Sequence, residues 1–138
     1  MSINISRLKP VLINVSRVLL ALYFLVPGIS KFTSWDRSVA LMEAHNMVMI
    51  PLLLTIAGVA QIVGGISLLL NKYVAICALG FAVMVLLINF NLHDFWNVYE
   101  GVDAEREGQN FFKNLAIFAG LLLLAALHME DAPDRQIS

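Results

Sequence analysis

Four long apolar runs, separated by polar connections, dominate the chain. The runs extend from about Pro10 to Phe32, Ile50 to Leu70, Tyr73 to Leu92 and Phe111 to Leu127. A helix needs about 20 apolar residues to cross the ~30 Å hydrocarbon core of a bilayer, and each run is close to that length. The pattern therefore predicts four transmembrane helices. Together they form a single domain over residues 1–138.

Composition agrees with this pattern. Hydrophobic residues make up 59% of the chain and charged residues 14%, against about 45–50% and 25% in soluble domains. We therefore expect an all-α integral membrane protein whose partner is the lipid bilayer. The net charge of -1, with no basic cluster, argues against nucleic acid as a partner. No Ala-x-Ala-like site follows the first run, so we expect a retained span rather than a signal peptide.

The connections predict an antiparallel bundle. Asn71-Lys72 is short enough to join neighbouring helices as an αα-hairpin. The longer connections, 33–49 and 93–110, share the opposite side and are expected to form a small outer cap. Three aromatic residues suit an interfacial position there: Trp35, Trp96 and Tyr99.

The positive-inside rule favours cytoplasmic termini. Five of the nine Lys and Arg residues would lie on the same side as the termini: Arg7, Lys9, Arg17, Lys72 and Arg135. Because such residues accumulate in cytoplasmic segments, we expect both chain ends to be cytoplasmic and the cap to face outward.

Helical spacing predicts the inward faces. Polar residues share a stripe with small residues on each run. The stripes are Arg17, Ala21, Phe24, Gly28 and Lys31; Gly58, Gln61 and Gly65 beside Gly64; Ala75, Ala78, Ala82, Val85, Asn89 and His93; and Lys113, Ala116, Gly120 and Leu127. Small residues let membrane helices approach closely. We therefore expect the polar residues to face the bundle interior.

Seven polar residues are the candidate ligand-binding residues. Five are predicted to cluster near the outer surface and two to lie deeper: Lys31, His93, Asp94, Lys113 and Asn114, and then Arg17 and Gln61. Each also has a structural interpretation. The lysines and Arg17 can snorkel to a membrane surface, Asp94 can pair with one lysine, and Gln61 can bond to a neighbouring helix.

His93 raises the question of a cofactor. His128 lies at the opposite end of the predicted bundle, roughly 24 Å away, so the two cannot share a haem in one molecule. A metal site on the outer side would have to come from Glu43, His45, His93 and Asp94, but these residues lack the ligand spacing typical of such sites, and we expect no metal. His93 is interpreted as a hydrogen-bonding or proton-handling group, or as a structural residue bonded to Asn89 or Asp94.

Short motifs recur in order through the spans. They are Arg17 with Leu19-Leu20 and Tyr23-Phe24, then Gly28-Ile29-Ser30-Lys31-Phe32, Gly64-Gly65 with Leu68-Leu69-Leu70, His93-Asp94-Phe95-Trp96, and Lys113-Asn114-Leu115 with Gly120. Over nearly the whole chain this series resembles the DoxX family of small bacterial inner-membrane proteins. The resemblance implies a multi-pass four-helix bundle in the bacterial cytoplasmic membrane. It also implies kinship to the membrane subunits of thiosulfate:quinone oxidoreductase.

One position departs from the family pattern. Many relatives carry a glutamate just before the Gly-Gly pair, where this chain has Gln61. A glutamine cannot carry a proton, so a mechanism that uses an acid at this level is in doubt.

Three functions remain open. The first is a subunit or accessory of a membrane redox complex, with a groove that holds a quinone headgroup against Lys31, His93 and Lys113. The chain shows no ligand set for a redox cofactor of its own, so electrons would come from a protein partner. The second is a non-catalytic membrane anchor or assembly factor. The third is a small transporter or binder of apolar metabolites, which requires a homo-oligomer. We do not expect this chain to catalyse a reaction alone.

Overall fold

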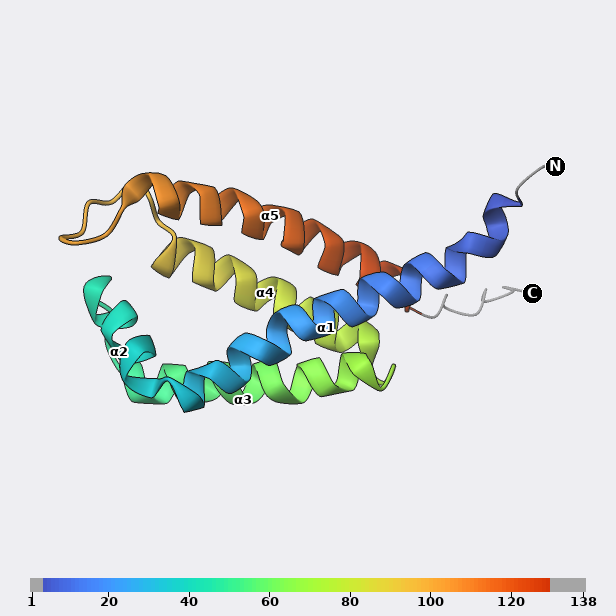
Figure 1. Ribbon diagram of the computed structural model, residues 1–138, viewed down its shortest axis with the longest axis horizontal. Coiled ribbons are helices and arrows are strands. Elements are labelled where there is room, and N and C mark those ends of the chain that lie inside the picture. The colour runs from blue at the N-terminus through green and yellow to red at the C-terminus, as the bar shows by residue number, and fades with distance from the viewer. Residues whose placement is uncertain (1–3, 130–138) are drawn as a thin grey trace, which may run out of the picture.

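The computed structural model describes residues 4–129, in which every regular element is a helix (Figure 1). The elements are η1 (Ile5–Leu8), a 3-10 turn, and the α-helices α1 (Lys9–Thr33), α2 (Trp35–Ala44), α3 (Ile50–Leu69), α4 (Val74–Leu92) and α5 (Ala104–Leu127). Four of them, α1, α3, α4 and α5, are long and apolar enough to cross a membrane. The predicted all-α architecture with four spans is confirmed. Arg135, which entered the charge count, lies outside the described residues.

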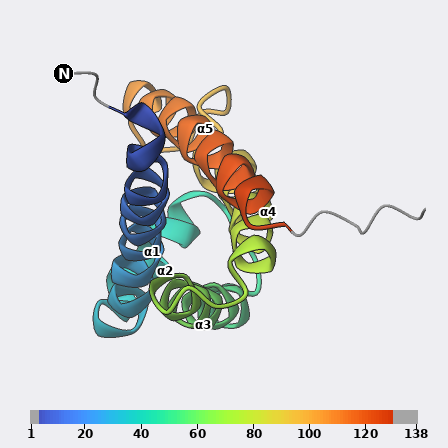
Figure 2. The ribbon, with the colours of Figure 1, turned by 90° about the vertical axis from the view of Figure 1, so that its right-hand side faces the viewer.

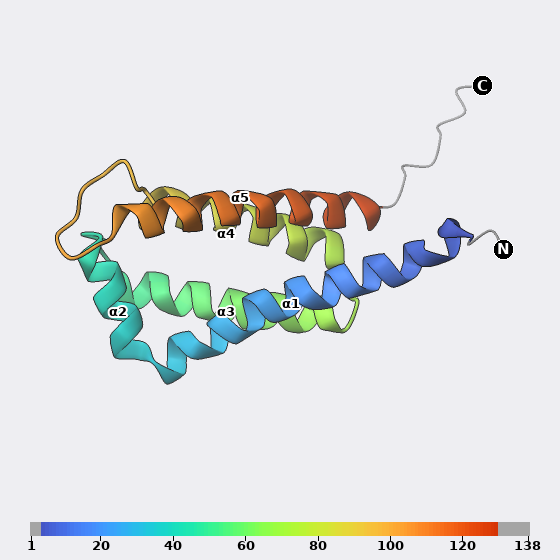
Figure 3. The ribbon, with the colours of Figure 1, turned by 45° about the horizontal axis from the view of Figure 1, so that its top comes forward.

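The spans pair into two layers. α1 packs mainly against α3, and α4 packs mainly against α5. Seen along the bundle, the four spans surround the ribbon of α2 behind them (Figure 2). From the side, α4 and α5 lie above α1 and α3, and α2 crosses one end (Figure 3). We call this end, with α2 and the connection before α5, the cap end.

The opposite end, called the turn end, contains the tight connection between α3 and α4. Asn71 (φ 56°) and Tyr73 (φ 54°) both adopt left-handed backbone conformations there. These two residues reverse the chain within a few positions, so α3 and α4 run antiparallel, as the short Asn71-Lys72 connection predicts. Both ends of the described chain lie on this side (Figure 1).

The last helix begins earlier than its apolar run. α5 starts at Ala104, about two turns before Phe111. The Asp103 carboxylate caps it by accepting hydrogen bonds from the backbone N–H groups of Glu105 (3.0 Å) and Arg106 (3.4 Å). Acidic residues in the first turn also complement the helix dipole. The charged end of the predicted cap connection is therefore helical.

The predicted inward faces of the first and second spans are confirmed. Arg17, Ala21, Phe24 and Gly28 are the buried residues of α1, and Gly58, Gln61, Gly64 and Gly65 are among those of α3. Two of these glycines are required by the packing of α1 against α3. A Cβ atom on Gly28 would lie 2.8 Å from the Gln61 Cβ, and one on Gly65 would lie 2.9 Å from the Leu25 Cβ. Only glycine allows α1 and α3 to approach this closely.

The predicted inward stripe of the last span is wrong. The buried residues of α5 are Asn114, Leu121, Leu124 and Ala125, so the face is rotated by about one residue, or about 100°. A Cβ atom on Gly120 would meet no atom within 4 Å. The reason is that α5 joins the core through large side chains, including Leu121 and Leu124. Ala116 and Gly120, the small residues of the predicted stripe, are not among the buried residues of α5.

Candidate functional site

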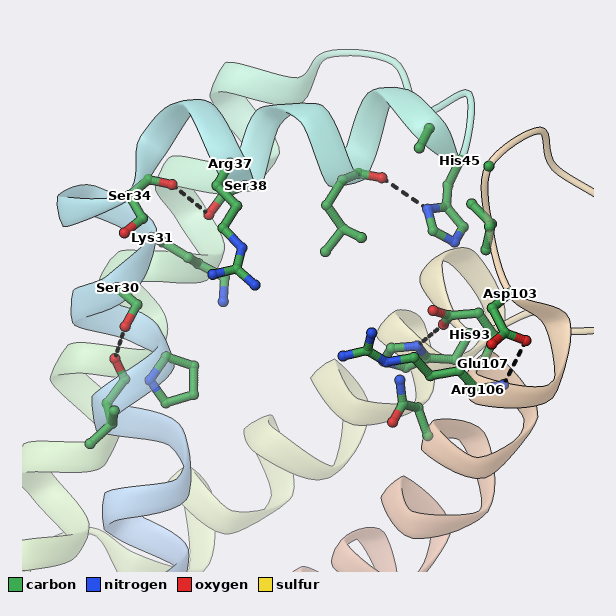
Figure 4. Close-up of a pocket in the computed structure, with 17 residues that line it drawn as sticks. Ser30, Lys31, Ser34, Arg37, Ser38, His45, His93, Asp103, Arg106 and Glu107 are labelled. Atoms are coloured by element: carbon green, nitrogen blue, oxygen red, sulfur yellow. Dashed lines mark hydrogen bonds and ion pairs between the residues drawn. The ribbon is translucent and has the colours of Figure 1, made fainter.

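A cleft of about 800 Å³ opens at the cap end, between α1 and α2 on one side and α4 and α5 on the other (Figure 4). This volume is in the range of small-molecule sites. Its apolar lining includes Val26, Pro27 and Leu41. Its polar side chains are Ser30, Lys31, Ser34, Arg37, Ser38, His45, His93, Asp103, Arg106, Glu107 and Asn110.

Three cations from three helices extend into this cleft. Lys31 comes from the last turn of α1 and Arg37 from α2, and both reach in from one wall, while Arg106 reaches in from the first turns of α5 (Figure 4). Among residues 4–129, none of the three has a carboxylate oxygen within 4.0 Å. The cleft therefore presents several unpaired hydrogen-bond donors.

The two carboxylates that line the cleft, Asp103 and Glu107, already have hydrogen-bond partners within the protein. Glu107 Oε2 lies 2.5 Å from His93 Nδ1, so these side chains form a hydrogen-bonded pair that links α5 to the end of α4. Asp103 caps α5. The His93 side chain bonds to neither Asn89 nor Asp94, the partners that one interpretation of the sequence gave it; only its backbone N–H donates to the Asn89 carbonyl oxygen (3.2 Å). The early start of α5 places Glu107 opposite His93 instead.

The structure separates the predicted outer cluster. Lys31 and His93 line the cleft, but Asp94, Lys113 and Asn114 do not. Lys113 is exposed on α5, because the inward face of this helix is centred one position later. The predicted meeting of Lys31, His93 and Lys113 is therefore corrected: Lys31 shares the cleft with Arg37 on its own wall and with Arg106 on the opposite wall (Figure 4).

Asn114 belongs to a polar chain inside the bundle. Its Oδ1 accepts a hydrogen bond from Tyr23 (3.0 Å), and its Nδ2 donates to Asn89 Oδ1 (3.0 Å). Asn89 Nδ2 in turn donates to the carbonyl oxygen of Phe111 (3.0 Å). These bonds connect α1, α5 and α4, so Asn114 serves the packing of the spans.

Asp94 lies at the start of the connection between α4 and α5 and is 4% exposed. It accepts hydrogen bonds from Asn97 Nδ2 (2.9 Å) and the Tyr99 hydroxyl (2.5 Å). The predicted ion pair with a lysine is not formed. Burial raises the pKa of the Asp94 carboxyl, but the hydrogen bonds outweigh this effect, and the net pKa is lowered.

The lowered pKa of Asp94 predicts a specific acid sensitivity. A depressed carboxyl pKa adds stability that is complete above the unfolded-state pKa, about 4, and is lost as the pH falls through the folded-state pKa. We expect the free energy of unfolding in detergent to fall over this acidic range in the wild type, and to fall less in Asp94→Asn. Tyr99→Phe should move the loss to higher pH. Identical pH profiles for wild type and Asp94→Asn would contradict this role.

The two deeper candidates lie outside the cleft. Arg17 Nη1 donates hydrogen bonds to the carbonyl oxygens of Leu68 and Leu69 (3.1 Å to Leu69), so it caps the C-terminus of α3 at the turn end. Gln61 is buried, and its Oε1 has no hydrogen-bond partner among the described residues. The predicted bond from Gln61 to a neighbouring helix is not formed.

Sequence reasoning missed the contribution of Arg37, Arg106 and Glu107. It placed all three residues in the cap connections but did not predict where their side chains point. The signal for the α5 residues is Asp103 followed by Glu105 and Glu107, the arrangement of an N-cap and an acidic first turn. No group of three His, Cys, Asp or Glu residues within positions 4–129 is placed to hold a metal ion.

Comparison with known proteins identifies the family. The DoxX family model matches residues 12–94. The inner membrane protein YqjF of Escherichia coli (strain K12) is 32% identical over 121 residues, which cover 86% of this chain and 85% of YqjF. No solved structure matches the chain. With its four membrane-spanning helices, this is a multi-pass protein of the bacterial inner membrane, and it belongs to the DoxX family.

Proposed function

We propose that this protein is a membrane subunit of a redox complex and that its cap-end cleft binds the headgroup of a quinone. The observation that carries the proposal is the mixed lining of the cleft. Hydrogen-bond donors on Lys31, Arg37 and Arg106 stand beside the apolar side chains of Val26 and Leu41. Small-molecule sites typically combine an apolar lining with a few convergent polar groups.

The residues present fit a quinone headgroup. Its ring is apolar, and its two carbonyl oxygens accept hydrogen bonds, which the lysine and arginine side chains can donate. The cleft includes Ser30 and Lys31, in the last turn of the α1 span. A ligand there can place its headgroup among polar side chains while its apolar tail stays in the lipid.

The His93–Glu107 pair gives the cleft a place to hold a proton. Reduction of a quinone to a quinol takes up two electrons and two protons. His93 Nδ1 and Glu107 Oε2 share a hydrogen bond in the cleft wall, and an imidazole ring can carry a proton on either of its nitrogen atoms. Gln61 cannot serve in this way, so proton exchange is assigned to the cap end. The electrons are assigned to a protein partner, in line with the kinship to oxidoreductase subunits that the family resemblance implies.

Quinone content of the purified protein tests this proposal. We expect protein isolated from its native membrane in mild detergent to carry extractable quinone, measured by liquid chromatography and mass spectrometry. His93→Ala should lower this content about tenfold, because it removes the partner of Glu107 Oε2 and leaves an unpaired carboxylate facing the acceptor oxygens of the headgroup. His128→Ala is the matched control, because His128 lies at the turn end and does not line the cleft.

Two outcomes would contradict the proposal. One is a wild-type protein without quinone in membranes that contain it. The other is equal quinone content in His93→Ala and His128→Ala. Copurification of a redox protein with the wild type would support the assigned role as a subunit.

A further inference from the structure

The cleft has an excess of positive charge that a neutral headgroup does not explain. Lys31, Arg37 and Arg106 extend into it from three different helices (Figure 4). Within the described chain, none of them pairs with a carboxylate, because Glu107 pairs with His93 and Asp103 caps α5. Like charges that converge at a membrane surface repel one another, and an anion between them relieves the repulsion.

A buried histidine adds an independent observation. His45 lines the same cleft and is 5% exposed. Its Nδ1 lies 2.9 Å from the carbonyl oxygen of Leu41, which can only accept, so Nδ1 carries the hydrogen. Its Nε2 is buried and has no partner among residues 4–129. An unpaired buried polar atom at the cleft is costly unless a ligand satisfies it.

We propose that the cleft binds an oxyanion of the phosphate type, held by Lys31, Arg37 and Arg106. The planar guanidinium groups of the two arginines match such oxygen atoms in bidentate geometry. Where the anion is free phosphate, its protonated oxygen can also donate a hydrogen bond to His45 Nε2, whereas a lipid phosphodiester has no such hydrogen and is held by the three cations alone. This inference goes beyond the quinone proposal and does not require it.

The phosphate group can come from an anionic lipid or from a free ion. Residues at the end of the α1 span and the exposed α2 are accessible to both sources. The two sources offer the same oxygen atoms to the same cations. They differ in whether the ligand remains in the bilayer, and this difference can be measured.

The test uses the full chain in nanodiscs of phosphatidylcholine. In one arm, inorganic phosphate is titrated by calorimetry. In the other arm, phosphatidylglycerol is added to the nanodiscs, and retained lipid is counted by native mass spectrometry. We expect binding in at least one arm, and a loss of about tenfold or more in affinity for Arg37→Ala and for Arg106→Ala. Lys113→Ala is the matched control, an exposed cation of α5 outside the cleft.

Each outcome decides the proposal. Binding in the phosphate arm supports a free oxyanion, and binding in the lipid arm alone supports a lipid headgroup, provided that the arginine variants lose it and Lys113→Ala keeps it. Binding in neither arm, or an equal loss in all three variants, overturns the proposal. Quinone content measured on the same samples separates the two proposals. Both proposals use Lys31, Arg37 and Arg106, so the phosphate arms are run on protein from which quinone has been extracted. Quinone in the extract with no phosphate binding afterwards contradicts only the oxyanion site.

Discussion

Replacement of Gly28 by leucine is expected to separate α1 from α3 and to destabilise the protein by about 3 kcal/mol or more. A Cβ atom at this position would lie 2.8 Å from the Gln61 Cβ and 3.2 Å from the backbone nitrogen of Ile62. Backbone atoms of α3 cannot move aside as a flexible side-chain end can, so the helices must part. Unfolding in mixed detergent micelles with increasing SDS, followed by circular dichroism, measures the loss.

Gly120→Leu provides the control for this effect. The chemical change is the same, but a Cβ atom on Gly120 meets no atom within 4 Å. We expect its free energy of unfolding to stay within about 0.5 kcal/mol of the wild type, as for a substitution that breaks no contact. Equal stability of the two variants would show that α1 and α3 do not pack through Gly28.

Replacement of Asn114 by leucine is expected to destabilise the bundle by about 1–3 kcal/mol. The change removes the acceptor of the Tyr23 hydroxyl and the donor to Asn89 Oδ1. Asn89 is fully buried, at 0% exposure, so its oxygen cannot turn to water. The same SDS unfolding measurement applies, and its free energy should fall even though leucine is the more apolar residue.

Asn91→Leu separates this network from a general effect of polar residues in a span. Asn91 is exposed on α4, and its Nδ2 donates only to the Leu87 carbonyl of its own helix (2.7 Å). We expect Asn91→Leu to change the free energy of unfolding little. A double-mutant cycle of Asn114→Leu with Tyr23→Phe should give a coupling energy of about 0.5 kcal/mol or more, because the side chains bond directly. Additive effects in the cycle would contradict a direct bond.

Much of the architecture could be predicted because a bilayer restricts the choices. Runs of about 20 apolar residues must be helices there, since every backbone polar group has to be satisfied internally. The two-residue polar link at Asn71-Lys72 allows only an antiparallel hairpin. The inward faces of α1 and α3 were also predictable, because the close approach of these two helices requires glycine at positions such as Gly28 and Gly65.

The expectation that small residues mark the inward face of a span failed for α5. Small residues permit close approach but do not enforce it, and α5 packs through Leu121 and Leu124. The rotation by about one residue exposes Lys113 and turns Asn114 inward. Lys113 and Asn114, which looked equivalent in sequence, are therefore exposed and buried, respectively.

The sequence by itself determined the membrane class, the four spans, the cap and the presence of Lys31 and His93 near one end. Only the tertiary structure decided which residues share the cleft. Arg37 and Arg106 are far apart along the chain, and they meet because α2 crosses the cap end while α5 begins early at its Asp103 cap. Hydrophobic periodicity reports burial along one helix. The convergence of charged groups depends on how separate helices are rotated and placed, which no local pattern encodes.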